Sequence, residues 1–381
     1  MEKILQHKLL KSESYLNQVI KMSIEPFSVE KIWVPTDFTE FGKPKENLVN
    51  VAGCENSHTS GIVMKVLQES LGSNPALLID HWQSQDTTLR KKLAELHDVA
   101  LEQVYLTAGA LAGIQYSFGI FVNENTNVGL LKPDFPGFVY FSKWKKANTH
   151  WLKNTEFPFY IGNRDIADFV RKNIVDFLIL SNPSAVMGTQ KETKEIEDLV
   201  KASPNTIFIV DEADSIHPDS SSAHLSKSYN NAIFLGSFSK FYGLSGLRVG
   251  YLITPKKFSE HFDRTISPAE LTSLAILAAT HVLDDKQYQR ETQEKVRKNL
   301  SSLESACEGI PYRVVPGSRC FASYLWADGG VEDPYQTLQG YGIKILKGSN
   351  FGIERGGRVN LSSTENIGKL TGAVKQIFPT R

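Results

Sequence analysis

Short and almost continuously apolar runs recur through the middle of the chain, and each is followed by a stretch with helical character. Such runs are typical of strands that are buried on both faces. Between them, apolar side chains return at helical spacing, as Leu89, Leu93 and Leu96 do. Strands that alternate with helices predict an α/β fold with a mostly parallel sheet. The predicted strands are residues 104–109, 127–132, 176–181, 206–212, 232–237 and 249–254.

The pattern changes after about residue 256. A long helical segment is predicted for residues 268–309, and shorter apolar runs follow at 320–326 and 342–346. We interpret this part as a smaller α/β domain. The predicted organisation has an N-terminal segment, 1–55, that packs with the small domain or covers the site, a large domain, 56–255, and a small domain, 256–381.

Composition and charge narrow the class of partner. The 381 residues include 42 Lys and Arg against 42 Asp and Glu, so the formal net charge is zero. A balanced charge gives no electrostatic footprint for nucleic acid or for an anionic membrane, which favours a small-molecule ligand. No apolar run has membrane-spanning length, and the charged N-terminal residues do not resemble a signal peptide.

The chain has three cysteines, Cys54, Cys307 and Cys320. Their number is odd, and their spacing fits neither a disulfide framework nor a metal site. We therefore expect no metal and a reducing compartment, the cytoplasm. Each cysteine is better interpreted as a small buried apolar residue than as a nucleophile.

Small and polar residues follow the predicted strands in turn. In an open α/β sheet, ligands bind at the carboxyl ends of the strands, so these residues are candidates for one site. Taken singly, each has an ordinary interpretation as a helix cap, a turn, a core aromatic or a solvated lysine. Taken together, they offer an amine, a carboxylate, an aromatic face, a phosphate cup and a second cation. The candidates are Gly109, Ala110, Leu111, Phe135, Asn182, Asp211, Asp214, Ser237, Ser239, Lys240 and Arg248.

This set suits an aldehyde cofactor that carries a pyridine ring and a phosphate. The segment SFSKFYGLSGLRVGY, residues 237–251, resembles the cofactor-lysine signature of the class I and II aminotransferases, fold-type I enzymes that use pyridoxal 5′-phosphate. The similarity is greatest to the histidinol-phosphate aminotransferase branch and covers about residues 50–370. It implies a large domain with a mostly parallel sheet between helices, followed by a smaller α/β domain.

The resemblance assigns a role to most of the candidates. Lys240 matches the Schiff-base lysine, whose amine also moves the proton between the substrate Cα and the cofactor. Asp211 matches the carboxylate that keeps the pyridine nitrogen protonated, and Phe135 matches the aromatic residue stacked on the ring. Arg358 matches the clamp for the substrate α-carboxylate, with a surface residue on a strand as the alternative. The expected phosphate and ring contacts are Ser237, Ser239, Arg248, Gly109, Ala110, Leu111 and Asn182.

Three positions depart from the family pattern. Relatives have a second asparagine, which contacts the ring oxygen of the cofactor, where this chain has Ala185. Relatives have a tyrosine that contacts the same oxygen where this chain has Asp214. We interpret Asp214 either as an acid/base or cation-binding group or as a residue at a helix start. Trp82 takes the place of the tyrosine that reaches the phosphate across the dimer interface, and its indole N–H still offers a donor.

Residues 52–61, AGCENSHTSG, lie where relatives place a segment near the substrate. Cys54, Glu55, Asn56 and His58 are therefore candidates for recognition of the substrate side chain.

The resemblance implies a homodimeric enzyme that forms an external aldimine with an L-amino acid and transfers its amino group to a 2-oxo acid. The altered ring-oxygen contacts support a second hypothesis, a lyase or cyclase that performs elimination, replacement or decarboxylation, because fold and cofactor do not choose between these reactions. A third hypothesis is a non-catalytic binding module with the same fold. The intact set of Lys240, Asp211 and Arg248 argues against this module.

Overall fold

The structure is a computed structural model, and it describes residues 48–53, 55–74, 78 and 85–379. The chain divides into two compact units, residues 1–44 and 45–381, and all described residues belong to the second. The expected boundaries after residues 55 and 255 remain predictions. Among the helices of the described ranges, none combines the length and the apolar character needed to cross a bilayer.

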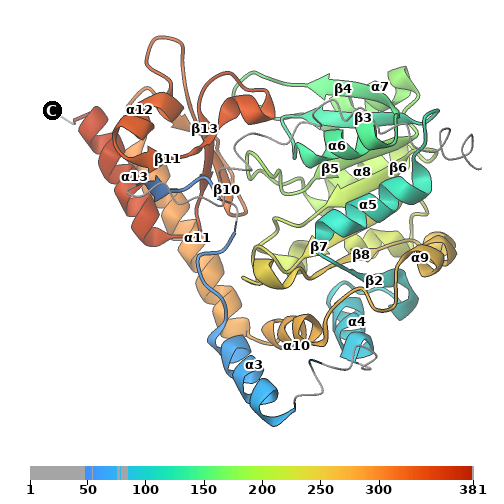
Figure 1. Ribbon diagram of the computed structural model, residues 1–381. Helices are drawn as coiled ribbons and strands as arrows, with labels where there is room; N and C mark the ends of the chain where they lie inside the picture. The colour runs from blue at the N-terminus through green and yellow to red at the C-terminus, as the bar shows by residue number, and fades with distance from the viewer. Residues whose placement is uncertain (1–47, 54, 75–77, 79–84, 380–381) are drawn as a thin grey trace, which may run out of the picture. The chain divides into compact units, whose positions relative to one another are not determined.

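A seven-stranded sheet is the largest sheet of the described unit and lies on the right in Figure 1. Its strands lie in the order β2-β8-β7-β6-β5-β3-β4, and all pairs are parallel except those that β8 makes with β2 and β7. This arrangement confirms the α/β fold with a mostly parallel sheet. The strands are β2 (Val104–Thr107), β3 (Asn127–Lys132), β4 (Asn148–Lys153), β5 (Phe177–Ser181), β6 (Ile207–Asp211), β7 (Ala232–Ser237) and β8 (Gly250–Ile253).

The pattern of apolar residues did not predict strand β4. Its sequence, NTHWLK, is polar at every second position or more often, and none of its residues is fully buried. As an edge strand it pairs only with β3, so it does not need the apolar run that marks the central strands. The period of hydrophobic residues is therefore a weaker signal at the edge than at the centre of the sheet.

Helices cover both faces of the sheet. Side chains alternate between the two faces along each strand, so apolar strands present an apolar surface on each face for helices to bury. In β5, Phe177 and Ile179 belong to one core cluster, whereas Leu178 and Leu180 belong to the other. Buried residues of α5, α6 and α9 join the first cluster, and those of α4, α7, α8 and α10 join the second. These helices are α4 (Gln85–Leu96), α5 (Ala110–Phe121), α6 (Gly137–Trp144), α7 (Asn163–Asn173), α8 (Thr193–Ala202), α9 (Ser259–Thr265) and α10 (Ser273–Val282).

The C-terminal part contains a second, antiparallel sheet in the order β12-β13-β10-β9. Val49 and Asn50 also pack here, because strand β1 pairs in parallel with β11. The single helical segment predicted for 268–309 is two helices, α10 and α11, and the Asp285 side chain caps the second by accepting from Tyr288 N. The remaining elements are β1 (Val49–Asn50), α3 (Gly61–Ser73), α11 (Lys286–Ala306), β9 (Tyr312–Val314), β10 (Ala322–Ala327), α12 (Pro334–Gly340), β11 (Ile343–Lys344), β12 (Leu346–Lys347), β13 (Gly357–Asn360) and α13 (Thr364–Ile377). Short 3₁₀ turns lie at Leu101–Gln103, Pro218–Ser220, Ala223–Lys227, Ser245–Leu247, Lys256–Phe258 and Gly348–Phe351.

Strand direction gathers the candidate residues at one edge of the large sheet. The carboxyl ends of β2, β3, β5, β6 and β7 lie at this edge, because these strands are parallel to one another. Strand β8 runs in the opposite direction and begins there, with Gly250 opposite both Thr107 and Ser237. Arg248, two residues before β8, is therefore brought back to the edge at which Lys240 leaves β7.

Candidate functional site

Lys240 lies in the loop that joins β7 to β8. The loop closes on itself, because Phe238 N donates to Val249 O (3.0 Å) and Leu244 N donates to Phe238 O (3.0 Å). The Phe238 and Phe241 side chains on either side of the lysine are fully buried and anchor the loop. The Lys240 Nζ lies 4.0 Å from Asp214 Oδ1, and the two side chains are only 17% and 12% exposed. The lysine is therefore a largely enclosed amine beside a carboxylate.

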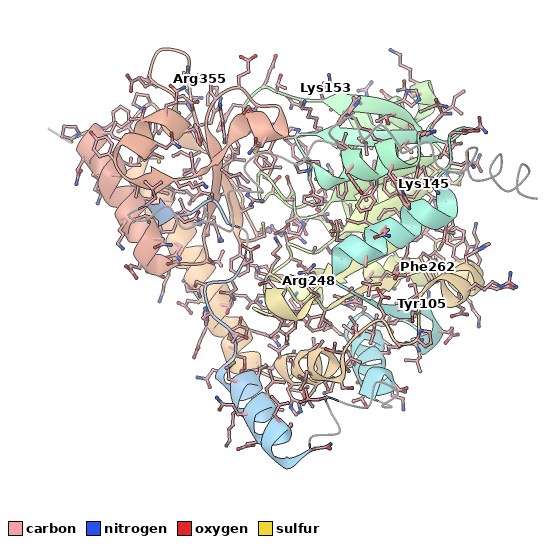
Figure 2. The ribbon with its side chains drawn as sticks, viewed as in Figure 1. Tyr105, Lys145, Lys153, Arg248, Phe262 and Arg355 are labelled. Atoms are coloured by element: carbon pink, nitrogen blue, oxygen red, sulfur yellow. The ribbon has the colours of Figure 1, made fainter. Side chains whose placement is uncertain are left out.

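Arg248 lies beside the start of α5 (Figure 2). Together with Gly109, the N-cap of α5, it forms a cup. The Arg248 Nη1 donates to Ser239 Oγ (3.2 Å) and to Ser245 O (2.9 Å). Gly109 has a φ of +76°, and a Cβ at this position would lie 2.5 Å from Arg248 Nη2. The backbone of the helix start can therefore lie against the guanidinium only because residue 109 has no side chain. Ser237 lies at the same end, where its Oγ accepts from Ser239 N (3.0 Å).

This cup has the chemistry of an anion site. Gly109 is the N-cap of α5 and offers no side chain to the first turn, so the N–H groups of the helix start face outward with the positive end of the helix dipole. The Arg248 guanidinium and the Ser239 hydroxyl add a cation and a donor. Ala110 is buried at this start, whereas the Leu111 side chain is exposed, so Leu111 can contribute only its backbone.

Asp211, the last residue of β6, is a buried carboxylate. Its Oδ1 accepts from Ala213 N at 3.0 Å. The pKa of Asp211 is raised to about 7, chiefly by burial. The charges of Asp214 and Asp134 contribute to this rise, and the Ala213 N–H and Lys240 oppose it. Burial disfavours the ionised form of Asp211, and a cationic N–H group placed against the carboxylate would stabilise that form.

Asp134 lies next to Asp211 in this group of carboxylates and follows strand β3. It accepts from Phe135 N (2.7 Å), from Ser181 N (3.1 Å) and from the Ser181 hydroxyl. Burial raises the pKa of Asp134 to about 6, and the Asp214 charge adds to the rise. Asp134 was not among the residues predicted for the site. Its position directly after a predicted strand was the same signal that selected the other candidates.

Arg358, on β13, brings a buried guanidinium to the site from the second sheet. Its Nη1 donates to Ala185 O (3.0 Å), and its Nη2 donates to the carbonyl oxygens of Ala52 and Gly53 (3.3 Å each). Within the described ranges, none of the ion pairs involves Arg358. The charge is thus buried against backbone carbonyls, which leaves it available for an incoming carboxylate.

The loop after β5 differs from the arrangement that the resemblance implies. Both ends of the Asn182 amide bind the backbone of Lys191: Nδ2 donates to Lys191 O (3.0 Å) and Oδ1 accepts from Lys191 N (2.7 Å). Ala185 is buried and offers the site only its backbone. Asn182 is therefore at the expected edge of the sheet, with its amide committed to holding the loop. Its assignment as a cofactor contact remains a prediction.

The remaining candidates are placed as follows. Phe135 contacts Phe138 edge-to-face, with ring centroids 5.4 Å apart, at the end of β3.

Asn56 donates to Phe241 O (3.1 Å) and to Tyr288 Oη (2.8 Å), so it anchors the loop that carries Lys240. Glu55 is exposed, and its carbonyl accepts from Asn360 Nδ2. His58 packs on Tyr288 and lies 2.7 Å from Lys295 Nζ. Cys54 and Trp82 lie outside the described residues.

A segment of the C-terminal part lies beside Asp214, the carboxylate next to Lys240. The sequence did not predict this contact. Cys320 forms an isolated antiparallel bridge with Ser215, the residue after Asp214. Burial raises the pKa of the Cys320 thiol well above its ordinary range, and the Asp214 charge also raises it. The structure thus confirms that Cys307 and Cys320 are buried, unpaired thiols. No sequence signal marked Cys320 as a neighbour of the site.

Comparison with known proteins agrees with this geometry. The sequence model of the class I and II aminotransferase family matches residues 55–374. Histidinol-phosphate aminotransferase of Caldicellulosiruptor saccharolyticus is 26% identical over 346 residues, which span 87% of this chain and 92% of that protein. Among solved structures, histidinol-phosphate aminotransferase from Sinorhizobium meliloti in complex with pyridoxal-5′-phosphate has a TM-score of 0.78 at 16% identity, over 93% of this chain and 98% of that one. L-threonine-O-3-phosphate decarboxylase from Porphyromonas gingivalis has the same fold, with a TM-score of 0.69 at 21% identity, over 87% of this chain and 100% of that one.

The chain belongs to the class I and II aminotransferase family. This membership confirms the expected enzyme class, and with it pyridoxal 5′-phosphate as the cofactor, against the hypothesis of a non-catalytic module. The residues present fit that cofactor at two of its ends. The cup of Gly109, Ser239 and Arg248 suits a phosphate, and the buried Asp211 carboxylate suits a protonated ring nitrogen.

A methyl group added at residue 109 should damage the phosphate cup. In Gly109→Ala, the new Cβ would lie 2.5 Å from Arg248 Nη2 at a φ that L-residues rarely adopt, so the guanidinium must move. We expect pyridoxal 5′-phosphate to bind about tenfold more weakly or worse, as measured by absorbance titration of the apoprotein. Gly119→Ala on the same helix is the control, because no atom lies within 4 Å of its Cβ position. Equal affinities in the two variants would contradict the assignment.

The buried Asp211 carboxylate should make the apoprotein less stable as the pH rises. Its pKa is about 7 in the folded protein against an ordinary value of 3.8, so the folded state holds the extra proton between these values. This stabilisation is present at low pH and is lost as the pH rises through about 7. In apo Asp211→Asn, the loss between pH 4.5 and pH 8 should be smaller by about 2 kcal/mol or more, as measured by urea unfolding. Parallel stability profiles for variant and wild type would contradict the shifted pKa.

Proposed function

We propose that the protein transfers an amino group from an L-amino acid to a 2-oxo acid, with pyridoxal 5′-phosphate as the carrier. The observation that carries this proposal is the meeting of Lys240, the buried Asp211 and the Arg248–Gly109 cup at one edge of the sheet. Membership of the class I and II aminotransferase family supports it. The same edge also receives the buried Arg358 from the second sheet.

The cofactor supplies an electron sink that stabilises negative charge at the substrate Cα. The residues of this chain would bind and orient it. Ser239, Arg248 and the N–H groups at the start of α5 would hold the phosphate. Asp211 would hold the proton on the ring nitrogen, because a buried carboxylate without a cation is unfavourable. Phe135 would pack on the ring.

Lys240 would hold the cofactor through its amine and would move the proton at the substrate Cα. Asp214, 4.0 Å from its Nζ, stabilises the protonated amine. Arg358 would receive the substrate α-carboxylate. A guanidinium binds a carboxylate in a bidentate manner with Nη2 and either Nη1 or Nε, so the carbonyl of Ala52 or Gly53 must release Nη2.

The second candidate is a lyase that uses the same cofactor for elimination or decarboxylation. The observation that favours it is the pair of unusual residues near Lys240. Ala185 provides no side-chain donor, and Asp214 provides a carboxylate where relatives have a tyrosine. A carboxylate next to the lysine offers a second proton acceptor, which elimination can use.

Product stoichiometry separates the two reactions. Holoenzyme is mixed with each of a panel of L-amino acids in the absence of any 2-oxo acid. Amino-group transfer should release one equivalent of 2-oxo acid per site and then stop, because the amino group stays on the enzyme. Continued turnover with release of ammonia would support elimination, and release of carbon dioxide would support decarboxylation.

Lys240→Ala is the matched test of the residue. The variant should keep the far-UV circular dichroism of the wild type and lose at least about 10³-fold in turnover, because both covalent attachment and proton transfer depend on the amine. Exposed Lys172→Ala on α7 is the control and should remain active. Full activity in Lys240→Ala would refute the assignment.

We also propose that the enzyme acts as a homodimer in the cytoplasm. The resemblance supports the dimer, and helix α3 supports it further, because Met64 and Leu71 are 46% and 40% exposed and lie seven residues apart on one side. Leu111, at the start of α5, is another exposed apolar residue, with 47% exposure. The two buried, unpaired thiols agree with a reducing compartment.

Light scattering should give a mass of twice the chain for the wild type. The double variant Met64→Glu/Leu71→Glu should dissociate at concentrations about 100-fold higher than the wild type, because it places two charges in the proposed contact. Ser73→Glu, on the other side of the same exposed helix, is the control and should remain dimeric. A monomeric wild type would contradict the proposal.

A further inference from the structure

Three hydrogen bonds and the backbone of Ala185 connect Asp134 with Arg358 in series. The Ser181 hydroxyl donates to Asp134, and its oxygen in turn accepts from Ala185 N at 2.9 Å. The Ala185 carbonyl accepts from Arg358 Nη1 at 3.0 Å. The series therefore begins after β3, passes the end of β5 and ends on β13 of the second sheet.

Each member of this series is fixed from more than one side. Asp134 is 8% exposed and accepts from the backbone of Phe135 and Ser181 as well as from the hydroxyl. These three donors orient the carboxylate, so the direction in which the Ser181 hydroxyl donates is set. The lone pairs of Ser181 Oγ are then left for Ala185 N, and this bond holds the backbone of Ala185, the residue whose carbonyl accepts from the guanidinium.

We propose that Asp134 is a positioning residue for Arg358, acting through the Ser181 hydroxyl and the Ala185 carbonyl. Asp134 does not touch the guanidinium. It determines where one end of the guanidinium is held before a substrate carboxylate arrives, which reduces the ordering cost of binding. The geometric part of the inference stands on the hydrogen bonds alone, and its effect on substrate binding rests on the proposed function.

The positioning of Arg358 should depend on the charge of Asp134. Protonation would remove one acceptor from a carboxylate that serves three donors, and the series would loosen. The pKa of Asp134 is raised to about 6, chiefly by burial; the three donors oppose this rise and the Asp214 charge contributes to it. Asp211 also faces it, since the Asp134 charge raises the pKa of Asp211. Arg358 should therefore be held firmly above about pH 6 and less firmly below it.

The first test does not depend on turnover. Phenylglyoxal modifies accessible guanidinium groups, and peptide mass spectrometry gives the rate at Arg358 in the holoenzyme. We expect Asp134→Asn and Ser181→Ala to be modified about tenfold faster than the wild type at pH 7.5, because the guanidinium loses a fixed partner. Ser181→Thr keeps the hydroxyl and should retain the slow rate. Unchanged rates in Asp134→Asn and Ser181→Ala, with the fold intact by circular dichroism, would overturn the proposal.

The second test measures the substrate. With the amino acid that reacts best, Asp134→Asn should raise KM about tenfold and change kcat by less than about threefold, since binding rather than chemistry is affected. The wild-type KM should rise as the pH falls below about 6, whereas the KM of the variant should stay flat. Asp168→Asn, an exposed residue paired with Arg171 on α7, is the control and should match the wild type in both tests. Equal KM–pH profiles for wild type and Asp134→Asn would also overturn the proposal.

The two tests separate this inference from the proposed function. If no amino acid reacts but the modification rates change as expected, the positioning is supported and amino-group transfer is refuted. If amino acids react and the rates do not change, amino-group transfer stands and the positioning role is refuted.

Discussion

The site depends on the burial of carboxylates at the ends of parallel strands. Asp134 and Asp211 are both less than 10% exposed, and burial raises the pKa of each. A carboxylate in such a place is tolerated only if donors or cations surround it. Here the backbone N–H groups of Phe135, Ser181 and Ala213 provide part of this stabilisation. Lys240 also favours the ionised form of Asp211, and in the proposed function the protonated ring of the cofactor would add a second positive charge.

The site also depends on the direction of strand β8. If β8 were parallel to β7, the residues before it would lie at the opposite edge of the sheet. Because β8 is antiparallel, a loop of only twelve residues, 238–249, carries both the lysine and the arginine to the same edge. The bond between Phe238 and Val249 closes this loop, so the amine and the guanidinium are placed as one rigid unit. The opposed strand therefore explains why both groups are encoded within one short segment.

Much of this arrangement could be predicted from the sequence, and the reasons are physical. The central strands carry uninterrupted apolar runs, so they and the residues that follow them, from Gly109 to Lys240, could be located in the chain. The edge strand β4 lacks such a run because only one neighbour buries it. The contacts between the second sheet and the site also could not be predicted from the sequence. The proximity of Cys320 to Asp214, and of Arg358 to Ala185, depends on tertiary packing between segments more than 100 residues apart.

The backbone carbonyls around Arg358 have a consequence for selectivity. In the proposed function, a substrate carboxylate at Arg358 would have to replace carbonyl oxygens that already accept from Nη2. Binding therefore depends on the difference between two sets of hydrogen bonds rather than on the strength of one. A planar carboxylate with two charged oxygens would make stronger bonds to the guanidinium than the carbonyl oxygens do, whereas an alcohol or an amide would not. The protein would thus reject simple amines, because the carbonyl oxygens of Ala52 and Gly53 would keep their hydrogen bonds to Arg358.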